Sequence, residues 1–193
     1  MRQGETAATA TLPHRCFTAD EYHRMGEAGI LRDDDRVELI EGQIVEMAAI
    51  GDRHVSRVIE LNAIFASRVG QRAWVSVQNP LRLSKQSEPQ PDLVLMRRAS
   101  DKGVTGAPHP EDVLLLIEVA DTTLLYDRDT KLPLYAAAGI PEVWILDLAG
   151  DRLRVYREPD GLDYRRADIL LRDATVSPLA FPDLELTVEE ILG

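Results

Sequence analysis

Glu118 stands where a charged residue is unexpected. It interrupts the apolar run LLLIEVA at residues 114–120, which is typical of a strand buried on both faces of a sheet. A carboxylate buried there without a partner costs several kcal/mol, so something must compensate its charge. An arginine salt bridge near the strand end is one explanation. A metal ion or a lysine, either of which would serve chemistry, is the other.

Asp92 has a similar place at the start of the strand-like segment PDLVLM, where Pro91 restricts the backbone. Two carboxylates on neighbouring strands can converge on one hard cation. Mg²⁺ is commonly bound by one or two protein carboxylates together with water and phosphate oxygens. Such a pair therefore indicates chemistry on a phosphorylated substrate. Taken alone, the Pro-Asp dipeptide more often marks a turn or a helix cap.

The elements that would carry these carboxylates alternate along the central part of the chain. Apolar residues recur at spacings of three and four between positions 52 and 69, which predicts a helix with one inward face. The residues of that face are Val55, Val58, Ile59, Leu61, Phe65 and Val69. Strands are predicted at 73–77, 91–96, 112–120 and 141–148. A helix over 122–139 should end at Gly139 and should start late or kink at Pro133, because proline lacks a backbone donor.

Shorter elements flank this centre on both sides. Thr18 and Glu21 have capping-box spacing and predict a short helix that ends near Gly29. The segment RVELIEGQIVEM predicts a hairpin around Glu41-Gly42. Residues 152–157, 163–170 and 175–186 predict short strands and turns, and TVEEIL predicts a final helical turn. The whole pattern predicts an α/β sheet with an N-terminal hairpin and a C-terminal β appendage.

Composition and charge limit the class of protein. The 193 residues are 45% hydrophobic and 28% charged, which predicts one domain at residues 17–193 behind a flexible arm at 1–16. No apolar run is long enough to span a bilayer, and Cys16 cannot form an internal disulfide, so a cytoplasmic protein without membrane contact is expected. The net charge of −11 disfavours nucleic-acid binding unless basic residues gather locally.

Several motifs occur together along nearly the whole chain. They are RVELIEGQIVEM, QPDLVLM, IEVADTTLLYDRDTKLPLYAAAGIPEVWILD and SPLAFPDLELTVEEIL. These segments resemble, in order, the opening hairpin, the two acidic motifs and the C-terminal signature of the putative restriction endonuclease family within the PD-(D/E)XK nuclease superfamily. The resemblance covers residues 17–192. It implies a restriction-endonuclease-like core, in which helices flank a central mixed sheet.

The same resemblance implies a metal-dependent endonuclease that hydrolyses phosphodiester bonds, with DNA as its substrate. Its catalytic residues would be Asp92, Glu118 and Lys131, and Asp92 and Glu118 would hold Mg²⁺ or Mn²⁺ together with the carbonyl oxygen of Val119. Lys131 would orient the attacking water or neutralise charge that develops on the phosphate. A homodimer is also implied, because nucleases of this superfamily commonly pair two sites.

The position of the lysine departs from the superfamily pattern. The lysine usually stands two residues after the acidic strand residue, on the same face of the strand. Ala120 occupies that place here, and in this branch of the family the lysine is carried on the following helix, where Lys131 matches it. A solvated surface pair with Asp127, four residues earlier, is the alternative. As a catalytic group, Lys131 should be replaceable by alanine with loss of activity and an intact fold.

Glu41, His54 and Gln90 match or flank family positions and are implied as accessory residues of the same cleft. A glutamate in a Glu-Gly turn is more often exposed, and a histidine at a helix start more often lies at the surface. Arginines around 53–72, 97–98, 152–157 and 165–166 could form a phosphate track or simply a mixed charged surface. The rival hypothesis to an enzyme is a nuclease-like interaction module without catalysis, favoured by the acidic charge and by Ala120.

Overall fold

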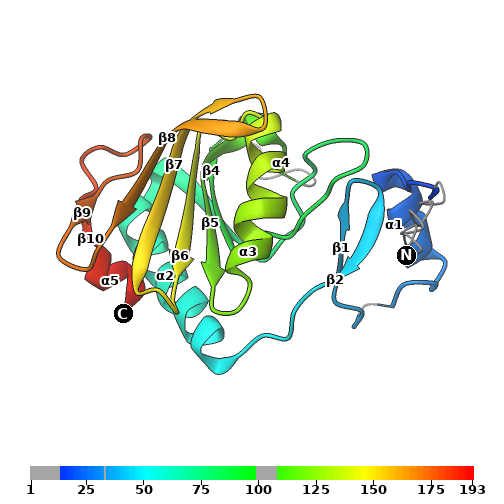
Figure 1. Cartoon of the computed structure of the whole chain (residues 1–193), viewed down its shortest axis with the longest axis horizontal. Coiled ribbons are helices and arrows are strands. Elements are labelled where there is room, and N and C mark those ends of the chain that lie inside the picture. Colours follow the sequence, from blue (N-terminus) through cyan, green and yellow to red (C-terminus); the bar gives the residue numbers. More distant parts are fainter. Residues whose placement is uncertain (1–13, 33, 99–107) are drawn as a thin grey trace, which may run out of the picture.

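A mixed sheet of six strands forms the centre of the protein (Figure 1). The computed structural model describes residues 14–32, 34–98 and 108–193, and most of the predicted arm lies outside them. In spatial order the strands are β3 (Ala73–Val77), β4 (Leu93–Arg97), β5 (Val113–Ala120), β6 (Glu142–Asp147), β7 (Arg152–Asp160) and β8 (Asp163–Leu170). Only β5 and β6 are parallel neighbours; the other neighbouring strands are antiparallel.

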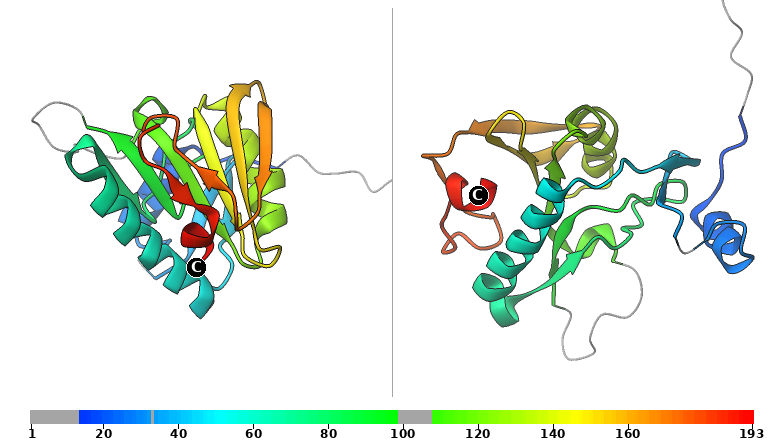
Figure 2. Two further views of the ribbon diagram at one scale, coloured as in Figure 1. Left: turned by 90° about the vertical axis from the view of Figure 1, so that its left-hand side faces the viewer. Right: turned by 90° about the horizontal axis from the view of Figure 1, so that it is seen from below.

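Helices cover both faces of the sheet (Figure 2). Helix α2 (Asp52–Val69) lies on one face, while α3 (Leu124–Tyr126), the π-helical turn η3 (Asp127–Lys131) and α4 (Leu132–Ala137) form the crossover on the other. Because strand side chains alternate, Ile117 and Val119 of β5 pack in the core with α2, and Leu116 and Ala120 pack in the core with α4. The predicted strand buried on both faces is confirmed.

Helix α2 has the predicted bounds but a narrower buried face. Val58, Leu61, Phe65 and Val69 are buried, whereas Val55 and Ile59 were predicted to face inward and are 42% and 62% exposed. Ile59 follows Val58 by one residue, which rotates it about 100° around the helix axis. The spacing of three and four therefore fits two overlapping stripes, and only one of them meets the sheet.

The crossover helix is distorted at the predicted place. Pro133 occupies the first turn of α4, where its ring would clash with a carbonyl one turn earlier in a regular helix. The chain widens instead into η3, and the N–H of Leu132 donates to the carbonyl of Asp127, five residues back. Gly139 ends the helix with a φ of 74°, as its position predicted.

The N-terminal elements are held by the connection between β3 and β4. Helix α1 (Ala19–Glu27) has the predicted capping box between Thr18 and Glu21. Strands β1 (Val37–Ile40) and β2 (Gln43–Glu46) form the predicted hairpin, with positive φ at Glu41 and Gly42. The N–H of Glu88, in that connection, donates to the carbonyl of Leu39 at 2.7 Å. This contact fixes the hairpin beside the segment that leads into β4.

The C-terminal part contributes more to the sheet than the predicted appendage. Strands β7 and β8 extend the six-stranded sheet, and only β9 (Thr175–Val176), β10 (Leu186–Thr187) and α5 (Val188–Leu192) lie outside it. Thr187 caps α5 through the N–H of Glu190 at 3.1 Å. This smaller unit packs against α2, at the far side of the molecule from the hairpin (Figure 1).

A buried ion pair joins β6 to β7 at the opposite end of the sheet from Asp92 and Glu118. Glu142 is fully buried and accepts hydrogen bonds from Arg157 and from the indole N–H of Trp144, both at 2.8 Å. Its other oxygen accepts from the N–H of Leu179 at 2.7 Å. We expect Glu142→Ala to lower the free energy of unfolding by about 3–5 kcal/mol, because Arg157 keeps a buried and uncompensated charge.

Chemical denaturation of the variant beside wild type measures this effect. Asp160→Ala is the matched control, since it removes a carboxylate from an exposed ion pair with Arg165 on the neighbouring hairpin and should change stability little. A loss below about 1 kcal/mol for Glu142→Ala would show that the pair is not needed for the fold.

Candidate active site

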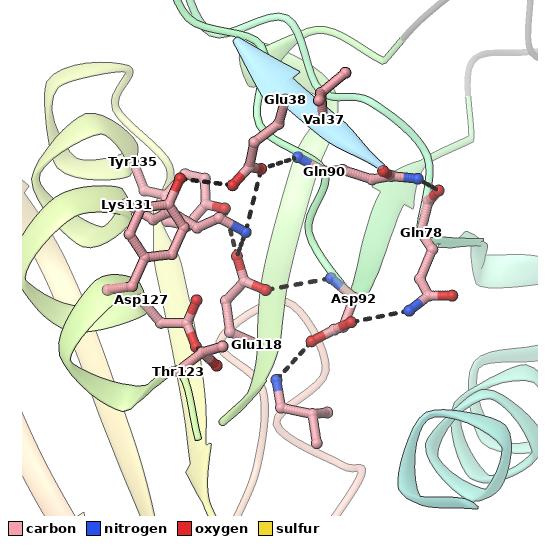
Figure 3. A network of polar contacts seen from close by, with 12 residues as sticks. Val37, Glu38, Gln78, Gln90, Asp92, Glu118, Thr123, Asp127, Lys131 and Tyr135 are labelled. Carbon is pink, nitrogen blue, oxygen red and sulfur yellow. Dashed lines mark hydrogen bonds and ion pairs between the residues drawn. The ribbon is translucent and has the colours of Figure 1, made fainter. Parts of the chain in front are cut away.

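The carboxylates of Asp92 and Glu118 lie side by side at one end of the antiparallel pair β4–β5 (Figure 3). The register pairs Leu93 with Ile117, so the residue before the first and the residue after the second face each other. The N–H of Asp92 donates to Glu118 Oε2 at 3.3 Å, and the N–H of Val119 donates to Asp92 Oδ2 at 2.8 Å. Both side chains are almost fully buried.

Lys131 supplies the positive charge next to this pair. Its Nζ lies 3.2 Å from Glu118 Oε1 and 3.4 Å from Glu38 Oε2, and its side chain is only 5% exposed. The alternative of a solvated surface pair is therefore wrong. The lysine reaches Glu118 from the crossover helix and not from the strand position that Ala120 occupies. Tyr135 adds a second donor, with its hydroxyl 2.5 Å from Glu118 Oε1.

Glu38 of β1 belongs to the same cluster and was not predicted. Its Oε1 accepts a hydrogen bond from the Tyr126 hydroxyl at 2.7 Å, and its Oε2 accepts from the N–H of Gln90 at 2.9 Å. Side chains alternate between the two faces of the short strand VELI, so Glu38 lies on the face opposite to that of Leu39. This second face was expected to be polar and exposed. Only the docking of the hairpin against the crossover helix buries that face, and no local pattern signals this docking.

The three predicted accessory residues, Glu41, His54 and Gln90, differ in whether the structure brings them to the carboxylates. Glu41 is exposed in the hairpin turn and does not line the pocket, so the structure does not bring it to the carboxylates. His54 does reach them, with Nε2 at 3.0 Å from Asp92 Oδ1, although the start of a helix favoured a surface position. Gln90 holds Glu38 through its backbone and donates its side-chain N–H to the carbonyl of Gln78. Gln78 in turn donates to Asp92 Oδ1 at 3.2 Å.

A pocket with a volume of about 660 Å³ is lined by Asp92, Glu118 and Lys131 and by their partners Glu38, His54, Gln78 and Gln90. One wall comes from the end of the hairpin and the segment that leads into α2, and the other comes from the loop after β5 and the start of the crossover helix. Met47, Ile50 and Leu125 make parts of these walls apolar, while Asp92, Glu118 and Lys131 lie among the charged lining residues. A small charged group that entered the pocket would therefore meet the two carboxylates and the lysine together.

The electrostatics of the cluster show a shortage of positive charge. Burial raises the pKa of Glu118 to about 8, against the opposing effect of Lys131. Burial likewise raises the pKa of Asp127 to about 6, although Lys131 and the Thr123 hydroxyl oppose the change. Burial lowers the pKa of Lys131, but the carboxylates of Glu118, Glu38 and Asp127 outweigh it and leave the pKa raised. An additional cation would thus be favoured here.

The donor set suits a hard metal ion in its chemistry, because carboxylate oxygens are the ligands that Mg²⁺ and Mn²⁺ prefer. Asp92 and Glu118 are the two residues that could share such an ion. Within the described ranges, no group of three or more histidine, cysteine, aspartate or glutamate side chains is arranged to hold a metal. A metal at this site would have to complete its coordination with backbone carbonyl oxygens, water or substrate.

The arginines favour a mixed surface over a phosphate track. Many of those that cluster in the sequence are ion-paired with acidic side chains. The pairs are Arg57–Glu60, Arg68–Glu190, Arg72–Asp183, Arg154–Asp147, Arg157–Glu142, Arg165–Asp160 and Arg166–Asp168. Such pairing leaves less positive potential for a polyanion.

The fold matches that of a solved structure. It superposes with a TM-score of 0.71 on the crystal structure of a putative nuclease belonging to DUF820 from Anabaena variabilis, at 18% identity, over 91% of this chain and 97% of that one. The mixed α/β architecture with helices on both faces of the sheet is therefore that of a known fold, and the predicted fold class is confirmed.

The family is shown by the sequence itself. The family model described as putative restriction endonuclease matches residues 19–189. The chain belongs to this family, as the motifs predicted. No curated protein matches the chain. Among the helices of the described residues, none has the length and apolar character needed to cross a membrane.

Proposed function

We propose that the protein is a metal-dependent endonuclease that hydrolyses phosphodiester bonds in DNA. The observation that carries the proposal is the buried pair of Asp92 and Glu118 with the ammonium of Lys131 3.2 Å from Glu118, all lining one pocket. Membership of the putative restriction endonuclease family supports hydrolysis of phosphodiesters as the reaction class. Two acids and a lysine at the ends of neighbouring elements supply the groups that such a hydrolysis needs.

Mg²⁺ or Mn²⁺ would be held by Asp92 and Glu118, with the carbonyl oxygen of Val119 as a further ligand. Bound there, the metal would polarise a phosphodiester oxygen and acidify a water molecule. The buried carboxylates around Lys131 support this assignment, because a divalent cation would stabilise the ionised form of Glu118, which burial disfavours.

The chain's own residues divide the remaining work. Lys131 would orient the attacking water or offset negative charge that develops on the phosphate. His54 and Gln78 each contact Asp92 Oδ1 and fix the direction of its carboxylate. The apolar side chains in the walls would reduce contact with water at the sides of the pocket, which would strengthen the electrostatic contacts at its base.

A nuclease-like interaction module is the second candidate. The net charge of −11 and the ion pairing of the arginines favour it, since both weaken attraction to DNA.

For the enzyme, we propose a homodimer in the cytoplasm. It would bring two sites to one substrate, and the second copy would allow both strands to be cut.

Cleavage of supercoiled plasmid and of single-stranded DNA by purified protein tests the proposal. We expect cleavage in Mg²⁺ or Mn²⁺ and none after addition of a chelator, because the proposed reaction relies on the metal to acidify the attacking water. Conversion to linear plasmid without accumulation of nicked circles would support paired sites. A well-folded protein that neither binds the metals nor cleaves would favour the interaction module.

A further inference from the structure

We propose that Glu38 is a positioning residue of the nuclease site: together with Glu118 it holds the ammonium group of Lys131 between two carboxylates. The inference rests on the proposed nuclease function and adds a residue from the N-terminal hairpin to it. It follows from the contacts of Glu38 with the crossover helix and with the segment before β4 (Figure 3).

Glu38 is engaged through both of its oxygens. Oε1 accepts from the Tyr126 hydroxyl at 2.7 Å, while Oε2 accepts from the N–H of Gln90 at 2.9 Å and lies 3.4 Å from Lys131 Nζ. The side chain is 2% exposed. Tyr126, Gln90 and Lys131 all line the pocket, so each contact of this carboxylate is made with a residue of the candidate active site.

Holding the hairpin in place does not require a charge at this position. Leu39 and Ile40, the next two residues of β1, are buried, and backbone hydrogen bonds join Leu39 to Glu88 in both directions. Burying a carboxylate beside these apolar anchors costs several kcal/mol unless a cation repays it. Lys131 is the cation that contacts Glu38. We therefore infer that the buried charge of Glu38 serves to position the ammonium group of Lys131.

The ammonium group needs such a second anchor. A lysine head group is a point charge at the end of a flexible four-carbon stem, and its position is set by its partners. With Glu118 alone, Nζ would be drawn toward the Asp92–Glu118 pair that is proposed to hold the metal. Glu38 attracts it from the hairpin side, at 3.4 Å against 3.2 Å for Glu118. A shift of about 1 Å in a catalytic group can cost a factor of about 100 in rate.

The experiment compares Glu38→Gln, Glu38→Asp and Glu41→Gln in plasmid cleavage at saturating metal, with melting temperatures recorded in parallel. Glu41→Gln is the matched control, because it makes the same change three residues away at an exposed position of the same hairpin. Glu38→Gln keeps the size and one acceptor oxygen but removes the charge. We expect its kcat to fall about 100-fold with little change in the KM for DNA.

Glu38→Asp keeps the charge with a shorter reach and should recover part of the lost kcat, which loss of packing alone would not allow. Glu41→Gln should match wild type. An unchanged kcat for Glu38→Gln would overturn the inference. So would a loss of kcat that accompanies a fall in melting temperature and is not relieved by Glu38→Asp. In both cases cleavage by the wild type would still support the nuclease. Wild-type protein without cleavage would instead refute the proposed function, and the role of Glu38 with it.

Discussion

Lys131→Met should abolish metal-dependent cleavage. The substitution keeps the length of the side chain but removes the ammonium group that lies 3.2 Å from Glu118. Loss of one positioned electrostatic group in an active site typically costs about 10²–10³ in kcat. Cleavage of plasmid under single-turnover conditions measures this step. Lys85→Met is the matched control, because Lys85 is exposed and does not line the pocket.

The same substitution should also destabilise the protein, which the sequence did not lead us to expect. Lys131 is buried among Glu38, Glu118 and Asp127, and removing it leaves these carboxylates without their cation. We expect the free energy of unfolding to fall by about 3–5 kcal/mol. Lys131→Arg separates the two effects: it retains the charge and should fold, but its planar guanidinium does not reproduce a point charge. Wild-type kcat in Lys131→Met would refute a catalytic role, whereas wild-type kcat in Lys131→Arg would show that the positive charge alone is sufficient.

The two acidic residues were predictable from sequence because each conflicts with its own surroundings. Glu118 lies in an apolar run that is typical of a strand buried on both faces, and Asp92 directly precedes the neighbouring strand. An antiparallel register between the two segments is then enough to bring the carboxylates together. Because a buried charge without a partner is costly, the sequence also predicts that Glu118 has partners. The structure shows them to be Lys131 and Tyr135.

The prediction that Lys131 belongs to the site rested on the family resemblance and not on its local sequence pattern. Its local pattern, with Asp127 four residues earlier, is equally typical of an exposed helix. Pro133 and the wide turn η3 change the direction of the helix surface just at these residues. A regular helical period therefore does not predict which of their side chains face the sheet.

Glu38 and Tyr126 escaped prediction for a different reason. Both are polar residues whose burial arises where separate elements meet, the hairpin on one side and the crossover helix on the other. Strand alternation and helical period describe how a side chain faces its own element, not what later covers it. Contacts between distant segments are determined by the tertiary fold alone, and the sequence of one chain carries no pattern for them.

Asp92→Asn should remove both cleavage and the stabilisation of the protein by Mg²⁺. At a metal concentration 100 times the dissociation constant, binding adds about 2.7 kcal/mol to the stability of the native state. For a chain of this length that corresponds to a rise of about 5–10 °C in melting temperature. The variant should show no such rise, because the new amide contributes a single neutral oxygen where the metal requires a carboxylate.

Stability without metal should respond in the opposite sense. The negative charge of Asp92 disfavours ionisation of Glu118 and raises its pKa, so replacing Asp92 by a neutral amide removes this unfavourable interaction. The amide oxygen can still accept from the N–H of Val119. The new N–H₂ can donate to Gln78 once that side-chain amide turns over, and to Nε2 of a neutral His54 that carries its proton on Nδ1. We therefore expect the metal-free variant to melt at or above the temperature of the metal-free wild type.

Thermal melts of both proteins with Mg²⁺ and with chelator measure the two effects, and Asp183→Asn, at an exposed ion pair with Arg72, should retain the full metal response. An equal rise in wild type and Asp92→Asn would place the metal elsewhere. If Mg²⁺ stabilises neither protein and the metal-free variant is the weaker of the two, the pair is a structural feature held by Lys131 and His54. The nuclease proposal would then lose its metal site, and the interaction module would be the better account of the same buried charges.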